Sequence, residues 1–80
     1  MELGRDGNAA AAAGQFREAV RIMPDLPEAR LNLGTALENE GNYSEALVQF
    51  DKILELNPTN AMALNHAQAL RQKLSSTQPH

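Results

Sequence analysis

Apolar residues recur along this chain at the spacing of an α-helix, in four segments separated by Gly, Asn or Pro. Apolar side chains three and four residues apart lie on one face of a helix, where they can be buried together. No segment alternates apolar and polar residues over the length of a strand. The pattern therefore predicts four helices and no sheet, over residues 9–23, 28–40, 44–57 and 61–74. The connections are only a few residues long, so neighbouring helices are expected to be antiparallel.

The residues between these segments have the properties of helix ends. Gly41 is typical of the residue that follows the C-terminus of a helix. Pro58 stops the next helix, because the residue before a proline is pushed out of the helical region. Asp25 and Glu28 have the spacing of an N-terminal capping box, and Pro27 suits the first turn of the helix that follows.

An internal repeat is the clearest feature: when the chain is shifted against itself by 34 residues, identical residues coincide at many positions. The identical pairs are Leu3 with Leu37, Gly7 with Gly41, Asn8 with Asn42, Ala12 with Ala46, Gln15 with Gln49, Phe16 with Phe50, Pro24 with Pro58 and Ala29 with Ala63. A period of this length indicates supersecondary units that stack side by side, because each unit is too small to bury its own apolar face. Each unit here consists of two helices.

Residues 27–60 resemble a tetratricopeptide repeat, whose signature runs W-x2-L-G-x2-Y, then A-x3-F, then P. The spacing is the same throughout, but Arg30 stands where Trp is usual and Leu37 where Tyr is usual. The preceding segment resembles the second half of another repeat, and the last helix resembles the first half of a third. The residues that match the signature, to which the resemblance assigns packing roles, are Leu33, Gly34, Leu37, Ala46, Phe50 and Pro58, with Ala12, Phe16 and Pro24 in the preceding half-repeat.

The resemblance implies an all-α fold of antiparallel helical hairpins, stacked as a short right-handed superhelix of about two repeats. In the family's terms the four helices are helix B, helix A, helix B and helix A. We expect a repeat module over residues 9–74, with the full repeat at 27–60. Residues 1–8 are expected to be a partial first helix or a frayed start, or else to extend the next helix. Residues 75–80 are expected to be a flexible tail.

Composition narrows the functional classes. The chain has 80 residues, a net charge of −3 and no cysteine, which leaves room for one small domain without disulfides or a thiolate metal site. Nucleic-acid binding is disfavoured, because neutralising phosphates takes clustered Lys and Arg side chains. No apolar segment approaches the length of a membrane-spanning helix. We therefore expect a cytoplasmic protein that binds neither nucleic acid nor membranes.

Residues that could carry catalysis are sparse. His66 and His80 are the only imidazoles, and neither belongs to a plausible Ser, His and Asp arrangement. Glu38 and Glu40 are two residues apart on a helix, so their carboxylates point in different directions. The chain has no phosphate-binding loop, dinucleotide fingerprint or zinc-protease motif. We expect no enzyme activity, no catalytic residue, no metal site and no cofactor.

The resemblance also implies a binding site, because the first helices of successive tetratricopeptide repeats line a groove that accepts a peptide. Carried over residue by residue, the groove positions are Glu28, Leu31, Asn32, Thr35, Glu38 and Asn39, then Met62, Asn65, His66, Ala69, Gln72 and Lys73. Leu31 and Met62 favour a groove that is used, since apolar residues opposite the core stripe otherwise face water. The alternative is that these residues are merely the solvated faces of two helices.

The expected function is therefore a protein–protein interaction module whose partner is a protein or peptide. Two alternatives stay open. The first is a structural element that self-associates, for example as a homodimer that joins copies through incomplete repeat ends. The second is a repeat segment of a larger tetratricopeptide protein whose activity lies elsewhere.

Overall fold

The computed structural model describes the backbone of residues 2–77 and the side chains of residues 11–76. This part of the chain folds into four α-helices, which are α1 (Glu2–Ile22), α2 (Pro27–Asn39), α3 (Tyr43–Leu56) and α4 (Ala61–Thr77). No residue from 2 to 77 lies in a strand, so the predicted all-α fold is confirmed. None of these helices combines the length and the apolar character that crossing a bilayer demands.

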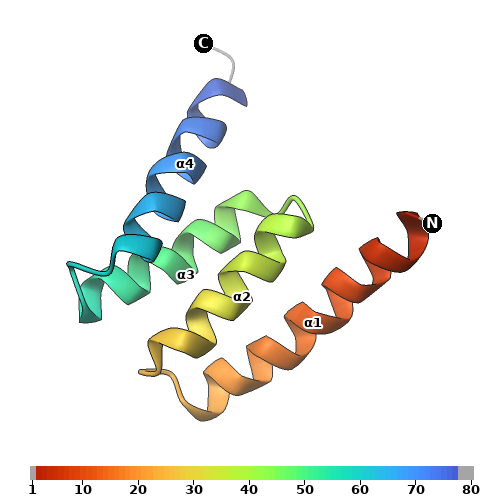
Figure 1. The fold of residues 1–80 in the computed structure, drawn as a ribbon, viewed down its shortest axis with the longest axis horizontal. Helices are drawn as coiled ribbons and strands as arrows, with labels where there is room; N and C mark the ends of the chain where they lie inside the picture. Colours follow the sequence, from red (N-terminus) through yellow and green to blue (C-terminus); the bar gives the residue numbers. More distant parts are fainter. Residues whose placement is uncertain (1, 78–80) are drawn as a thin grey trace.

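The helices form a single row in which each packs mainly against its neighbours along the chain (Figure 1). α2 contacts α1 on one side and α3 on the other, and α4 packs on α3. Successive helices run in opposite directions, and the chain measures 39 × 38 × 18 Å. The arrangement is the predicted fragment of an α-helical solenoid, with helical hairpins stacked in chain order.

The core lies where α3 meets α2 and α4. Phe50, Leu37, Ile53 and Leu70 are the largest side chains that are fully buried. Burying one such side chain completely contributes about 1.5–3 kcal/mol relative to leaving it exposed. Between them lie small residues such as Ala46, which is also fully buried and lets the helix backbones approach closely. Phe50 is the one fully buried aromatic ring among the described residues, so the interior depends strongly on it.

The turn between α2 and α3 shows why Gly41 ends the helix. The φ angle of Gly41 is +84°, in the left-handed region that other residues rarely adopt. The N–H of Asn42 donates to the carbonyl of Leu37 at 2.8 Å, and the N–H of Gly41 donates to the carbonyl of Glu38 at 3.0 Å. These two bonds form a Schellman cap, which satisfies carbonyl groups at the end of α2. The break predicted at this position is confirmed.

The two terminal helices are longer than predicted. α1 begins at Glu2, so residues 2–8 continue that helix instead of forming a partial first helix or a frayed start. The alanine run at 9–13 has high helix propensity, and an existing helix is extended residue by residue at low cost. α4 continues through Thr77, so residues 75–77 are helical where a flexible tail was expected. The division into a repeat module and two ends stays a prediction.

The start of α2 differs from the sequence interpretation in one detail. Pro27 lies in the first turn, as predicted, but the N-cap residue is Leu26 and has no side-chain hydrogen bond. The capping box expected at Asp25 is therefore wrong. The N–H of Leu26 bonds to the carbonyl of Met23 at 3.2 Å, and this tight turn places Asp25 one residue before the cap position.

Candidate functional site

A cavity of about 300 Å³ is lined by residues of three helices. Its walls are Ala12 and Phe16 of α1, Leu31, Asn32, Thr35, Ala36 and Asn39 of α2, and Met62 of α4. The predicted groove positions that the cavity brings together are Leu31, Asn32, Thr35, Asn39 and Met62. Sequence reasoning had given Ala12 and Phe16 packing roles only. Their place in this wall could have been inferred from the 34-residue repeat. The repeat makes the pair α1 and α2 equivalent to the pair α3 and α4, so α1 is expected to lie beside α2.

The cavity wall combines apolar and amide groups. Phe16 and Leu31 are partly buried, whereas Met62 is 57% exposed. Asn32 and Asn39 are exposed, and their amides can both donate and accept hydrogen bonds. A mostly apolar concave surface with a few well-placed polar groups is the usual composition of a ligand site.

Glu38 and His66 connect α2 to α4. Nδ1 of His66 donates to Oε1 of Glu38 at 2.9 Å. The ring of His66 stacks on the ring of Phe50, with centroids 4.6 Å apart and planes 10° from parallel. The side chains of His66 and Glu38 are 32% and 20% exposed, respectively. These two groove candidates therefore hold helices together and present only part of their surface to a ligand.

The other predicted groove residues lie outside the cavity wall. Nζ of Lys73 lies 5.3 Å from the centroid of the Tyr43 ring, so this α4 residue makes a cation–π contact with α3. The remaining candidates, all exposed, are Glu28, Asn65, Ala69 and Gln72. The structure thus brings five of the predicted groove residues into a cavity and leaves four others exposed on the helix surface. Glu38, His66 and Lys73 make contacts between helices.

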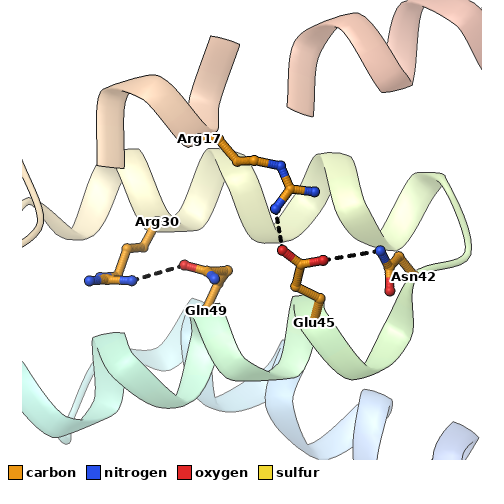
Figure 2. A network of polar contacts seen from close by, with 5 residues as sticks. All are labelled: Arg17, Arg30, Asn42, Glu45 and Gln49. Atoms are coloured by element: carbon orange, nitrogen blue, oxygen red, sulfur yellow. Dashed lines mark hydrogen bonds and ion pairs between the residues drawn. The ribbon is translucent and has the colours of Figure 1, made fainter. Parts of the chain in front are cut away.

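A polar network connects α1 to the start of α3 (Figure 2). Arg17 of α1 donates to one carboxylate oxygen of Glu45, whose other oxygen accepts a 3.2 Å hydrogen bond from Nδ2 of Asn42. The hydrogen bond to Glu45 raises the pKa of Arg17, so this guanidinium stays charged throughout the neutral range. The contact links α1 to α3 through two residues that do not line the cavity.

Arg30, which stands at the position usual for Trp, makes a second polar link in Figure 2. Its Nη1 donates to Oε1 of Gln49 at 3.0 Å, and its Nε donates to the carbonyl of Pro24 at 2.9 Å. Gln49 is only 8% exposed, so the first bond satisfies a buried polar group. Arg30 therefore ties α2 to α3 and to the α1–α2 turn by hydrogen bonds in place of aromatic packing.

A row of antiparallel helices with a 34-residue period defines an α-helical repeat protein built from hairpins. The sequence of residues 27–60 matches the family model of the tetratricopeptide repeat. These residues contain α2, α3 and the turn to α4, so they form one complete repeat, and the four helices amount to about two. The resemblance found in the sequence is confirmed. As a family, tetratricopeptide repeats mediate contacts between proteins.

Proposed function

We propose that this protein is a non-catalytic protein–protein interaction module that binds a peptide or helix of its partner at the cavity. The observation that carries the proposal is the cavity itself, in which α1, α2 and α4 together supply apolar and amide groups. It includes five of the groove positions that the tetratricopeptide resemblance implies, and these come from both helices expected to line a groove.

The cavity residues have the chemistry that peptide binding needs. Met62 is exposed, and its flexible thioether chain adapts to ligands of different shape. A ligand that covers Met62 and Leu31 removes apolar surface from water, at about 25 cal/mol per Å² buried. The amides of Asn32 and Asn39 can pair with main-chain N–H and C=O groups and so orient the ligand.

The non-catalytic part of the proposal rests on what the ionisable residues do. Glu38 and His66 contact each other and brace α4 against α2. Arg17 with Glu45, and Arg71 with Asp51, are ion pairs between helices. Among the residues that the structure describes, no three His, Cys, Asp or Glu side chains are grouped as a metal site. In this proposal the charged side chains orient helices and carry no chemical step.

A pair of matched variants tests the site. Peptides selected from a random library on the immobilised protein supply the ligand, and titration calorimetry measures their affinity. Met62→Glu should weaken binding at least about tenfold, because the ligand would bury a charge. Val48→Glu is the control, since Val48 is 49% exposed and belongs to α3, outside the cavity wall. Unchanged affinity in Met62→Glu, or a loss confined to Val48→Glu, would refute the proposal.

A second candidate function is self-association through apolar side chains of α1 and α4. Phe16 is only partly buried, whereas its repeat equivalent Phe50 is fully buried, and Leu64 on α4 is 39% exposed. A dimer that covers these side chains would continue the stack. Sedimentation at tens of micromolar separates the two candidates: a dimer supports self-association, and a single species near 8.7 kDa rejects it.

A further inference from the structure

The turn between α1 and α2 carries three large apolar side chains that face solvent. Ile22, Met23 and Leu26 are 63%, 55% and 42% exposed, respectively. The N–H of Leu26 donates to the carbonyl of Met23 at 3.2 Å, so a tight turn keeps the three residues close together. Single exposed apolar residues are ordinary, but a group of them marks a candidate contact site. These three residues form the turn patch.

The turn between α3 and α4 is the repeat equivalent of this turn, and the two lie on the same edge of the row of helices (Figure 1). Its backbone is closed in the same way, by a 3.1 Å bond from the N–H of Asn60 to the carbonyl of Asn57. The 34-residue period makes Met23 equivalent to Asn57 and Leu26 equivalent to Asn60. The same turn therefore forms with polar residues at both positions, so its backbone does not require Met23 and Leu26 to be apolar.

Leu26 also leaves α2 without a side-chain cap. At the second turn, Oδ1 of Asn60 accepts a 3.0 Å hydrogen bond from the N–H of Ala63 near the start of α4. Leu26 is the N-cap residue of α2 and makes no such bond. Asparagine is among the best N-cap residues and leucine among the poorest. Leu26 is thus unfavourable for both capping and solvation, and a local rule broken without structural gain is expected at a functional position.

The turn patch is held by contacts that do not depend on a ligand. Nε of Arg30 donates to the carbonyl of Pro24 at 2.9 Å, and its Nη1 donates to Gln49 on α3. The repeat equivalent of Arg30 is Leu64, whose side chain cannot donate, so this brace belongs to the first turn alone. A surface that is already ordered loses little conformational entropy when it binds.

The border of the turn patch is acidic. Asp25 and Glu28 are exposed, and neither forms an ion pair with another described residue. Of the cations near them in sequence, Arg21 pairs with Glu18, and Arg30 bonds to uncharged groups. The turn patch is therefore apolar at its centre, with two unneutralised carboxylates at its edge.

We propose that the turn patch binds a partner protein whose contact surface is apolar at its centre and carries Lys or Arg side chains at its margin. This interaction is separate from peptide binding in the cavity, because Ile22, Met23 and Leu26 do not line the cavity. The apolar side chains supply contact area, and Asp25 and Glu28 select the basic margin, since complementary charge attracts the right partner and repels others.

Charge argues against two other occupants. A second copy of this chain has the same acidic border at its own turn patch, and its cavity wall contains no Lys or Arg. An anionic membrane surface would repel Asp25 and Glu28. The second turn does not compete for the partner, because the equivalents of these two acids are the uncharged Thr59 and Met62.

Two synthetic amphipathic helices are the probes. Both have Leu along one face, and one carries Lys at the margins of this face where the other carries Glu. Each labelled peptide is titrated with the full 80-residue protein and followed by fluorescence anisotropy. We expect the Lys peptide to bind saturably and the Glu peptide to bind at least about tenfold more weakly. Equal affinity of the two, or no binding of the Lys peptide at millimolar concentration, overturns the inference.

The double variant Met23→Asn/Leu26→Asn gives the first turn the residues of the second. It should weaken binding of the Lys peptide at least about tenfold. Its melting temperature should rise by about 4–8 °C, because asparagine can cap α2, so the loss cannot be attributed to unfolding. Leu56→Asn is the control, since Leu56 is 51% exposed at the end of α3, and it should leave the affinity unchanged. Unchanged affinity in the double variant, an equal loss in the control, or a lower melting temperature of the double variant overturns the inference.

Two further outcomes assign the turn patch differently. Co-sedimentation with anionic phospholipid vesicles that is lost in the double variant would identify a lipid surface as the occupant and overturn the inference. Binding of the Lys peptide that depends on Met62 and not on Leu26 would place the peptide in the cavity. That result also overturns the inference, but it leaves the proposed function of the cavity intact.

Discussion

Gly34 and Phe50 meet where α2 crosses α3, and the ring of Phe50 occupies the space that a side chain on residue 34 would need. Ring atoms of Phe50 lie 2.7, 2.9 and 3.0 Å from the position of a Cβ on Gly34. Phe50 is fully buried, and its ring also stacks on the imidazole of His66 from α4. One aromatic ring thus joins three consecutive helices, which explains why the repeat signature needs a glycine at one position and a phenylalanine sixteen residues later.

We expect Gly34→Ala to destabilise the protein by about 1–3 kcal/mol, the range for overpacking a close contact. Gly14→Ala is the control, since Gly14 lies inside α1 and a Cβ there meets nothing within 4 Å. It should stabilise by about 0.5–1 kcal/mol, because alanine favours the helix interior over glycine. Urea denaturation measures both variants, and equal effects of the two would contradict the packing at Phe50.

Phe50→Ala should cost about 3–5 kcal/mol, the usual range for truncating a buried aromatic side chain. A domain of this size has a total stability of only about 4–12 kcal/mol, so this substitution removes a large fraction of it, and nearly all of it at the lower end of that range. Phe16→Ala, the repeat equivalent, should cost only about 1–2 kcal/mol because Phe16 is partly buried. Thermal melts followed by circular dichroism decide this, and a melting temperature unchanged by Phe50→Ala would show that the ring is outside the core.

Gly41→Ala should destabilise by about 1–2 kcal/mol, since alanine is strained at a φ angle of +84°. Gly41→Asn should cost less, because asparagine tolerates the left-handed region better than other side chains do. Gly14→Ala again serves as the control for adding a methyl group at a helical glycine. The order of melting temperatures, wild type above Gly41→Asn above Gly41→Ala, is the expected result, and the reverse order of the two variants would disagree with a Schellman cap.

Arg30→Ala should cost about 1–3 kcal/mol, because it leaves the buried amide of Gln49 without its hydrogen bond. Arg17→Ala should cost no more than about 1 kcal/mol, since the side chains of Arg17 and Glu45 are 48% and 37% exposed. The pKa of Arg17 is raised in the folded protein, so its contribution is present at any lower pH and is lost only as the pH rises through that raised value. The difference in the free energy of unfolding between Arg17→Ala and wild type should therefore be constant across the neutral pH range. Chemical denaturation at several pH values measures both the size of this difference and its dependence on pH.

The number of helices and their packing order could be predicted from sequence, because the apolar period and the 34-residue repeat each pointed to stacked hairpins. Short sequence motifs predicted the ends of the helices less well. Gly7 and Asn8 repeat the dipeptide at Gly41 and Asn42, yet the first pair lies inside α1 and the second ends α2. The turn at Gly41 is reinforced by the packing of α2 on α3, and the dipeptide alone does not encode that contact.

The candidate site was predicted only in part. Helical spacing identified Leu31 and Met62 as apolar residues outside the core stripe, and both line the cavity. The contact of Glu38 with His66 joins residues 28 positions apart, and its geometry depends on how α4 is set against α2. The contribution of Phe16 likewise depends on the angle between α1 and α2. Side-chain directions of this kind follow from tertiary packing and not from sequence spacing.

Chemical-shift mapping tests most directly the central claim, that the cavity of α1, α2 and α4 is a binding site for a partner peptide. Isotope-labelled protein is titrated with a library-selected peptide, and the amide signals are followed by NMR. The account predicts that the largest shifts fall at Phe16, Leu31 and Met62, which line the cavity. Shifts centred instead on the exposed α3 residues Val48 and Leu56 would contradict it.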